Sequence, residues 1–178
     1  MASNYACLSQ IDPPWIHIDL LSDLDHIMIP SYQYCQGDNN CVLRVIRGRV
    51  VCNTSLLMNE FAAAFQFPIT DFGANWYALK DCLSCLDEWL PATKYIVYIT
   101  EAELVLSEQT EEWKWFLLTL HEVCTYWSKP IADNGRFNRD SIPFHVLLKY
   151  DYGSLDKILR LVRQATDHFP GILVSGML

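Results

Sequence analysis

The sequence FPITDFGANWYALKDCL, residues 67–83, joins a polar loop to an amphipathic helix. Pro68 and Gly73 favour a loop, and the Asn75 side chain can accept hydrogen bonds from the free N–H groups of a helix's first turn. From Trp76 onward the apolar residues recur with helical spacing, so we expect a helix that begins directly after Asn75. Its apolar stripe consists of Trp76, Leu79, Cys82, Leu83 and Leu86.

The opposite face of this expected helix is aromatic and acidic. It carries Tyr77, Asp81, Ser84 and Glu88 at positions i, i+4, i+7 and i+11, and Asp71 lies in the loop before it. Periodicity alone indicates an ordinary solvated helix face beside a core helix. A surface that binds another molecule is the alternative.

The composition is that of a globular protein with its own core. The 178 residues are 51% hydrophobic and 13% aromatic, and the net charge is −8. Such an acidic chain lacks the basic surface that a nucleic-acid-binding protein needs. We expect no membrane span and no secretory signal, because no apolar run approaches 18 residues and the first residues lack the signal pattern. Seven cysteines, several within apolar segments, indicate reduced and mostly buried thiols, hence a cytoplasmic protein.

The negative charge is concentrated in one part of the chain. Residues 71–122 contain ten acidic and three basic side chains, whereas residues 129–178 contain five acidic and seven basic ones. Nearly all the acidic excess therefore begins at the loop of the first stretch. An acidic surface can attract and hold a basic partner, although it can also serve solubility alone.

Strands and helices alternate along the chain on both sides of the first stretch. A central strand is expected at 41–47, apolar strands at 95–99 and 144–148, a short strand within 13–20 and a last strand at 172–174. Further helices are expected at 56–65, capped by Thr54 or Ser55, at 111–127, and from Ser154 to Phe169. This order predicts an α/β fold with a small parallel sheet. We expect one domain over 1–178, with a core of about 41–149, an N-terminal extension 1–40, and a C-terminal helix and edge strand in 150–178.

The sequence shows none of the common catalytic or cofactor-binding motifs. Its glycines form no phosphate-binding loop, and its five histidines are scattered without metal-ligand spacing. Cys82 and Cys85 have a redox or metal spacing, but they fall within a helix and lack a second pair. Asp81 and Glu122 could form a carboxylate pair, yet nothing near them supplies a nucleophile or a metal. We therefore expect no catalytic residues, no cofactor and no metal.

The first stretch and its neighbours resemble a known family. Phe72-Gly73, Asn75, Ala78-Leu79 and Asp81-Cys82-Leu83 resemble the signature of the barstar family, small intracellular inhibitors of barnase-type ribonucleases. The resemblance extends through residues 42–68, 89–91 and 95–102. Residues 13–15 and 143–146 look like longer, bacterial barstar-related proteins.

This resemblance implies a three-stranded parallel sheet packed by helices. It also implies that the loop and the helix after it fill the active site of a ribonuclease, with acidic side chains in place of RNA phosphates. Asp81 matches the central acidic contact, and Glu122 approximately matches a second one. Gly73 matches a loop glycine, which suits a positive φ or a close approach to a partner.

Three residues depart from the family pattern on the face that would choose the partner. Tyr77 replaces a second aspartate, Lys80 stands where an aromatic or acidic residue is usual, and Asp71 stands where an aromatic contact is expected. We therefore expect a toxin related to barnase but distinct from it. Tyr77 is the expected aromatic contact, because Trp76 lies on the inward stripe.

The sequence thus predicts an immunity protein that is a monomer when free and occludes a cognate bacterial toxin, expected to be a basic nuclease domain. It is not expected to bind nucleic acid or a membrane. An interaction module that neutralises a non-nuclease toxin through the same face is one alternative, and a carboxylate-dependent hydrolase is another. The expected partner-binding residues are Asp71, Phe72, Gly73, Tyr77, Lys80, Asp81, Ser84, Glu88 and Glu122.

Overall fold

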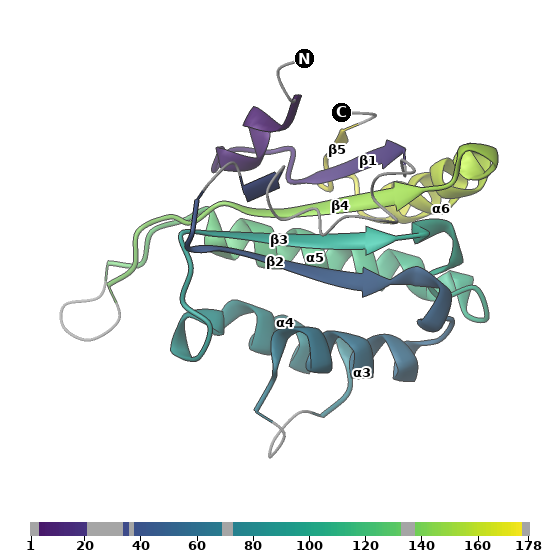
Figure 1. The fold of residues 1–178 in the computed structure, drawn as a ribbon. Helices are drawn as coiled ribbons and strands as arrows, with labels where there is room; N and C mark the ends of the chain where they lie inside the picture. The colour runs from purple at the N-terminus through teal and green to yellow at the C-terminus, as the bar shows by residue number, and fades with distance from the viewer. Residues whose placement is uncertain (1–3, 21–33, 36–37, 69–72, 133–137, 176–178) are drawn as a thin grey trace.

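Five parallel strands form one sheet at the centre of the protein, in the order β2-β3-β4-β1-β5 (Figure 1). The computed structural model describes residues 4–20, 34–35, 38–68, 73–132 and 138–175. The strands are β1 (Ile16–Leu20), β2 (Cys41–Arg47), β3 (Lys94–Thr100), β4 (Phe144–Tyr150) and β5 (Val174–Ser175). The sequence prediction of a parallel α/β fold is therefore confirmed. The expectation that 41–47 is a central strand was wrong, because β2 lies at an edge of the sheet and pairs only with β3 among the described strands.

The sheet is larger than the three strands that the family resemblance implies, so that expectation was wrong. The short strand expected within 13–20 is β1, and it pairs along its whole length with β4, from Ile16 beside Val146 to Leu20 beside Tyr150. The last strand in turn pairs with β1 at Ile16 and His17. The two terminal segments thus extend the sheet because the outer edge of β4 would otherwise expose unpaired backbone N–H and C=O groups.

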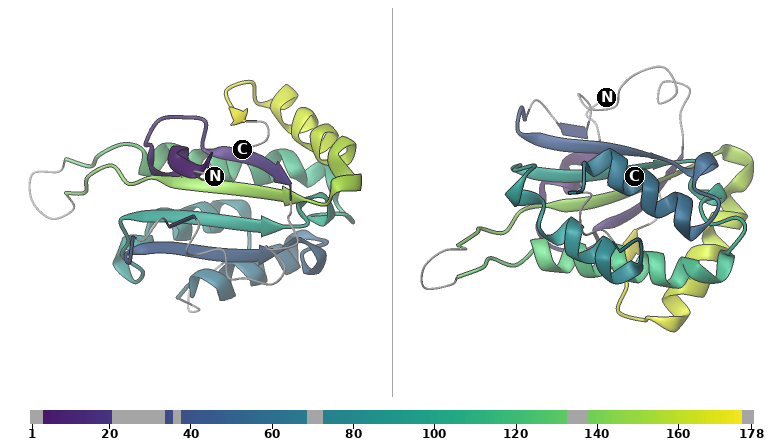
Figure 2. Two further views of the ribbon diagram at one scale, coloured as in Figure 1. Left: turned by 45° about the horizontal axis from the view of Figure 1, so that its top comes forward. Right: turned by 90° about the horizontal axis from the view of Figure 1, so that it is seen from below.

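All four long helices of the described residues pack on one face of the sheet (Figure 2). They are α3 (Thr54–Phe65), α4 (Trp76–Ser84), α5 (Trp113–Trp127) and α6 (Leu155–His168). Short 3-10 helices connect the elements: η1 (Asn4–Ser9), η2 (Gly48–Val50), η3 (Leu86–Glu88), η4 (Ala102–Leu104), η5 (Thr110–Glu112) and η6 (Tyr152–Ser154). Within the described part of the chain, every helix is too short or too polar to cross a bilayer.

The helix boundaries differ from the sequence expectations in local detail. Asn53, and not Thr54 or Ser55, caps α3 by accepting a hydrogen bond from the Leu56 N–H. The first helical turn of α6 has no side-chain cap from Ser154. On α6, Leu159 is exposed, because Leu161 faces the core together with the other apolar residues.

The opposite face of the sheet carries a smaller apolar cluster mixed with buried polar side chains. The cluster consists of Leu8, Tyr34, Ile96, Tyr98 and Leu147. Beside it lie the buried side chains of His17, Asp19, Lys94, His145 and Lys149, which we call the polar layer. Residues of the N-terminal extension cover this face (Figure 1).

Two of the seven cysteines depart from the expectation of reduced thiols. Cys35 and Cys41 are joined as a disulfide, with their Cα atoms 5.6 Å apart. This bond ties the N-terminal extension to the first residue of β2. The thiols of Cys52, Cys82, Cys85 and Cys124 are free.

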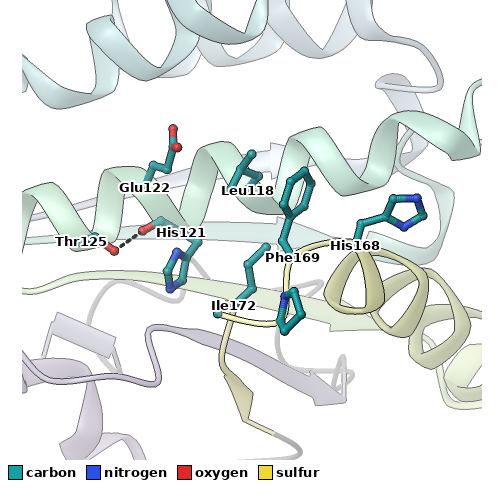
Figure 3. A pocket seen from close by; sticks show the side chains of 9 residues that line it. Leu118, His121, Glu122, Thr125, His168, Phe169 and Ile172 are labelled. Carbon is teal, nitrogen blue, oxygen red and sulfur yellow. Dashed lines mark hydrogen bonds between the residues drawn. The ribbon is translucent and has the colours of Figure 1, made fainter.

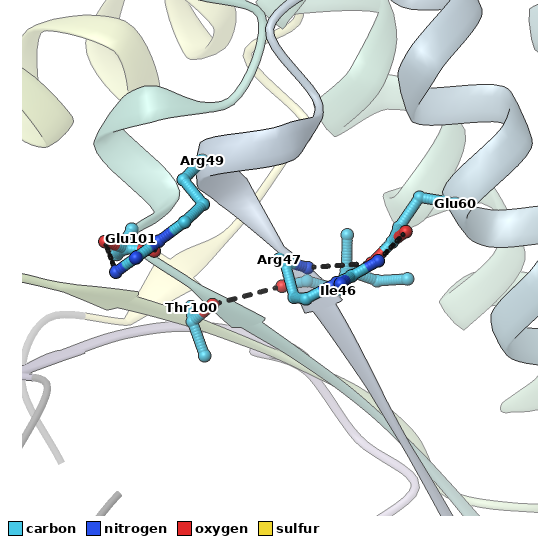
Figure 4. A network of polar contacts seen from close by, with 6 residues as sticks. All are labelled: Ile46, Arg47, Arg49, Glu60, Thr100 and Glu101. Carbon is cyan, nitrogen blue, oxygen red and sulfur yellow. Dashed lines mark hydrogen bonds and ion pairs between the residues drawn. The ribbon is translucent and has the colours of Figure 1, made fainter. Parts of the chain in front are cut away.

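The carboxyl end of β2 is fastened to its neighbours by two arginines (Figure 4). The Arg47 guanidinium binds both carboxylate oxygens of Glu60, at 2.8 and 2.9 Å. Arg49 holds Glu101 in the same two-point manner, at 2.6 and 2.5 Å. Between them, a Cβ atom on Gly48 would overlap the carbonyl oxygen of Glu101, so only glycine fits where β2 ends against β3.

Candidate protein-binding site

Helix α4 is positioned by its cap and by two buried leucines. The Asn75 side chain accepts a hydrogen bond from the Ala78 N–H at 3.0 Å, as the sequence predicts, and donates one to the Gly73 carbonyl at 3.1 Å. Leu79 and Leu83 are fully buried against the core. The cap and the leucines together fix the rotation of α4, so its other face points away from the protein.

The turn before α4 is built differently from the expectation. Ala74, and not Gly73, has the left-handed backbone conformation, with φ of 44°. The positive φ suggested for Gly73 is therefore wrong. Gly73 is exposed, and a Cβ there would lie 3.0 Å from the Asn75 amide nitrogen, so the glycine leaves room for the cap.

The outward face of α4 presents an aromatic ring and a carboxylate. Tyr77 is 78% exposed, which is unusual for so large an aromatic side chain. Asp81 lies one turn further and is exposed, and no ion pair to it is formed by any residue that the structure describes. Trp76 turns inward instead, where its indole N–H donates to Glu112 at 2.8 Å. The predicted division between an inward Trp76 and an outward Tyr77 is confirmed.

Lys80 and Glu122 lie between α4 and α5 and pair with each other. The distance from the Lys80 ammonium to the Glu122 carboxylate is 3.4 Å, and their side chains are 36% and 46% exposed. Lys80 therefore balances the charge of the second expected acidic contact. Both residues line a groove between the two helices, together with Ser84, Thr125, Tyr126, Lys129 and Ile131.

The remaining expected contacts are less close to this face. The sequence places Glu88 on the same helix face as Tyr77, but helix α4 already ends at Ser84. Glu88 belongs to the separate turn η3. Glu88 is exposed there, but the turn interrupts the helical spacing that links it to Tyr77. Asp71 and Phe72 lie outside the described residues.

The acidic excess of residues 71–122 is not spread evenly over the surface. Glu101 is bound to Arg49, and Glu108 accepts a hydrogen bond from Asn53 at 2.9 Å. Glu103 is buried, and this burial raises the pKa of its carboxyl group. Near α4, by contrast, Asp81, Asp87 and Glu88 are all exposed. These three side chains form no ion pair among the described residues, so α4 and η3 carry exposed negative charge, as does Glu111 in η5.

The thiols of Cys82 and Cys85 show no sign of metal or redox chemistry. Burial raises the pKa of both thiols, which keeps them protonated and poorly nucleophilic. Within the described part of the chain, no three His, Cys, Asp or Glu side chains are arranged to hold a metal ion.

One polar feature escaped the sequence. The rings of His17 and His145 lie on neighbouring strands, with nitrogen atoms 3.0 Å apart. The two residues are 128 positions apart in the chain, so no local motif could reveal their pairing. They belong to the polar layer and are remote from α4, across the sheet.

A family model named Barstar (barnase inhibitor) matches residues 42–149, more than half of the chain. The match runs from β2 to β4 and so includes α3, α4, β3 and α5, while β1, α6 and β5 lie outside it. No curated protein matches the sequence. The chain belongs to the Barstar family of barnase inhibitors.

Proposed function

We propose that this protein inhibits a ribonuclease of the barnase type and occludes its active site with the outer face of α4 and the loop before it. The exposed carboxylate of Asp81 is the observation that carries the proposal. It lies at the centre of the outward face and has no ion pair among the described residues. A charge held in this way remains available to a basic partner.

Charge complementarity explains how such a surface would inhibit. A ribonuclease binds the phosphates of RNA with basic side chains, and a carboxylate on a rigid helix can occupy the same place. The helix is rigid because Leu79 and Leu83 are buried and Asn75 caps its first turn. The exposed acids near α4 would also speed association at low ionic strength.

Tyr77 would supply the main apolar contact. Aromatic residues often contribute most to the affinity of protein interfaces, and Tyr77 already projects from the surface. No rearrangement of the core is needed to bury its ring in a partner.

Lys80 would set the choice of ribonuclease. Its ammonium group offsets the charge of Glu122, so the α4–α5 groove is less acidic than it would be if Glu122 were unpaired. We propose that the partner is a protein toxin distinct from barnase, with a neutral or acidic group at the part of its rim that faces Lys80. The protein would then act as an immunity protein for a basic nuclease domain of its own bacterium, and would bind no nucleic acid itself.

The test is inhibition of a panel of purified small basic ribonucleases that includes barnase. The wild-type chain should inhibit at least one of them at a one-to-one ratio. Asp81→Asn should weaken inhibition by a factor of 10² or more, which corresponds to about 3 kcal/mol.

Asp156→Asn is the matched control, because it removes one exposed negative charge from α6, away from α4. It should leave inhibition within about twofold of wild type, the effect of net charge alone. If no ribonuclease of the panel is inhibited, the proposal is wrong, and the next hypothesis to test is binding of a non-nuclease toxin. If the protein is instead a carboxylate-dependent hydrolase, it should show metal-dependent turnover that Asp81→Asn abolishes.

A further inference from the structure

The α4–α5 groove lies beside the outward face of α4 and has a volume of about 360 Å³. Figure 3 shows the Glu122 side chain projecting from α5 away from the hollow that Phe169 and Ile172 line. Its carboxylate points instead toward α4, where the Lys80 ammonium group lies 3.4 Å away. The groove therefore continues the outer surface of α4 across to α5.

The charged groups that line the groove leave it with one positive charge. Lys80 and Lys129 contribute two positive charges, and the Glu122 carboxylate, which is paired with Lys80, contributes one negative charge. Lys129 is exposed and has no ion pair among the described residues. The adjoining surface has the opposite sign, because Asp81 on α4 and Asp87 on η3 are exposed. The acidic face of α4 thus borders on a basic groove.

The wall that carries Lys129 is held in place by Arg139. The Arg139 guanidinium donates hydrogen bonds to the carbonyl oxygens of Tyr126 and Lys129, at 3.1 and 3.3 Å. The backbone N–H groups of Ile131 and Arg139 each donate to the carbonyl oxygen of the other residue, at 2.7 and 3.0 Å. Because this backbone is fixed before a partner binds, less conformational entropy is lost when Lys129 makes a contact.

The size of a stable interface indicates that a partner of α4 would also cover the groove. Specific protein–protein interfaces bury about 800 Å² per partner and use about 20 to 30 residues on each side. Helix α4 has nine residues, and Leu79 and Leu83 among them are buried in the core. The interface must therefore reach beyond α4, and the groove is the surface that adjoins it on the side of α5.

The polar groups of the groove indicate what it would accept. Two ammonium groups and the Ser84 hydroxyl can donate hydrogen bonds there, and the Glu122 carboxylate is already paired with Lys80. Tyr126 and Ile131 add apolar surface beside them. An ionised carboxylate only accepts hydrogen bonds, and a single one would neutralise the charge of the groove.

We infer that the groove receives an aspartate or glutamate side chain from the rim of the ribonuclease, and that Lys129 binds its carboxylate together with Lys80. Asp81 would meet the basic active site of the same enzyme. A ribonuclease with a basic rim would instead place like charge against Lys129, so this lysine would discriminate between ribonucleases. The inference rests on the proposed function, because it names a further contact of the same partner and the residue that makes it.

Removing the charge of Lys129 while keeping most of its stem tests the inference. Lys129→Met should raise Kd for the ribonuclease that the wild-type chain inhibits best by a factor of about ten or more, mainly through faster dissociation. Lys157→Met on α6 is the matched control, because it removes the same charge outside the groove, and it should stay within about twofold of wild type. Both variants should keep the wild-type Tm. Surface plasmon resonance measures the rates.

The sign of the effect separates a specific contact from net charge. Loss of a cation makes the whole chain more acidic, and this alone should slightly tighten binding to a basic ribonuclease. Weaker binding of Lys129→Met would therefore report a contact at the groove, and Lys129→Arg should restore most of the affinity. If Lys129→Met binds as tightly as Lys157→Met, or if Lys129→Arg is as weak as Lys129→Met, the inference is overturned.

Cross-linking of the wild-type complex identifies the group that occupies the groove. A water-soluble carbodiimide joins a lysine amine to a carboxylate in contact with it, with loss of water. We expect mass spectrometry to find Lys129 linked to an aspartate or glutamate of the ribonuclease. If ribonuclease lysines are linked to acidic residues of α4 and no link from Lys129 is found, the acidic occupant is overturned.

The outcomes separate this inference from the proposed function. If the wild-type chain inhibits no ribonuclease of the panel, the proposed function fails, and this inference fails with it. If the wild-type chain inhibits and Asp81→Asn weakens it, but Lys129→Met leaves Kd unchanged, only this inference is overturned.

Discussion

Charged side chains lie on both sides of the sheet, but in opposite circumstances. On the outer face of α4, Asp81 is exposed and has no ion pair among the described residues. In the polar layer on the other side, Lys149 and Asp19 are 2.6 Å apart and their side chains are only 2% and 8% exposed. The Tyr5 hydroxyl donates a further hydrogen bond to the same carboxylate, at 3.0 Å.

This contrast separates the two uses of charge in the protein. A solvated carboxylate needs no ion pair within the protein and can instead pair with a basic side chain of a partner. A buried charge must be paired where it stands, because its removal from water is costly. Substitutions on α4 should therefore change binding and leave stability intact, and substitutions in the polar layer should do the reverse.

The largest effect is expected at the buried ion pair. Lys149→Met leaves the Asp19 carboxylate buried without its cation, and should lower the free energy of unfolding by about 3 to 5 kcal/mol. Urea unfolding followed by tryptophan fluorescence measures it. Glu122→Gln breaks the exposed pair with Lys80 and should cost less than about 1 kcal/mol. Adding Asp19→Leu to Lys149→Met should recover much of the loss, and similar costs for the buried and the exposed pair would contradict the contrast.

The next effect lies on α4 and concerns binding. Asp81→Ala should weaken the complex with the inhibited ribonuclease by about 2 to 5 kcal/mol, mainly through faster dissociation, if the carboxylate is desolvated there. Its unfolding free energy should stay within about 0.5 kcal/mol of wild type. Surface plasmon resonance gives the rates and urea unfolding gives the stability. A loss of both together would place Asp81 among the structural residues.

Acid should weaken the fold through the histidine pair. Burial lowers the pKa of His17 to about 3 and that of His145 to about 4, so both rings are neutral at pH 7. The Gln10 carbonyl accepts from His145, whose other nitrogen, in the neutral ring, accepts from His17, and His17 in turn accepts from the Ser175 hydroxyl at 2.6 Å. Since an unfolded histidine titrates near 6.5, the contribution is complete above this pH and is lost as the pH falls toward 4.

Between pH 6.5 and 5 we expect a loss of about 2 kcal/mol for each of the two histidines. Urea unfolding at several pH values measures the slope. His121 contributes in the same direction, since burial lowers its pKa, so the test compares the wild type with His17→Gln. The variant should be less stable at pH 7 and lose less on acidification. An unchanged slope would show that the pair is not the sensitive element.

A smaller effect is expected at the exposed pair beside Asp81. Lys80→Ala frees the Glu122 carboxylate and makes the face more acidic. Association with the inhibited ribonuclease should become faster by a factor on the order of two to five at low salt, and this gain should vanish at 1 M salt. Stopped-flow fluorescence measures the rate. Lys157→Ala on α6 is the control of equal charge, and an equal gain there would mean that only net charge matters.

The smallest effect concerns the turn before α4. Ala74→Gly removes the steric cost of the left-handed conformation and should stabilise the fold by about 0.5 kcal/mol, net of the greater entropy of the unfolded chain. Gly73→Ala should destabilise it by a similar amount, because the new Cβ presses on the Asn75 cap. Thermal unfolding of the two variants gives the sign of each change. A loss of stability in Ala74→Gly would refute the assignment of the strained residue to Ala74.

The local elements were predictable because their signals lie within a few neighbouring residues. The stripe Leu57, Phe61 and Phe65 on α3 is buried as expected, as is the stripe from Trp113 to Trp127 on α5. The outward position of Tyr77 followed from helical spacing in the same way. Helix α4 was predicted too long, since periodicity does not show that the backbone leaves the helical conformation at Cys85.

The candidate site was only half predictable for the same reason. That Asp81 faces outward is a matter of spacing along one helix. That Lys80 pairs with Glu122, 42 residues away, depends on how α4 packs on α5. That Lys129 and Ile131 line the groove between these helices likewise depends on where the segment after α5 lies against α4.

The sequence by itself determined which segments are strands and helices, which face of each helix is apolar, and that Asp81 lies on the outer face of α4. These features depend on periodicity and on caps such as Asn75, which act over a few residues. The tertiary structure alone decided that the sheet has five strands, that Glu122 is balanced by Lys80, and that His17 meets His145. Such contacts join residues far apart in the chain, and only the packing of the whole core sets the distances between them.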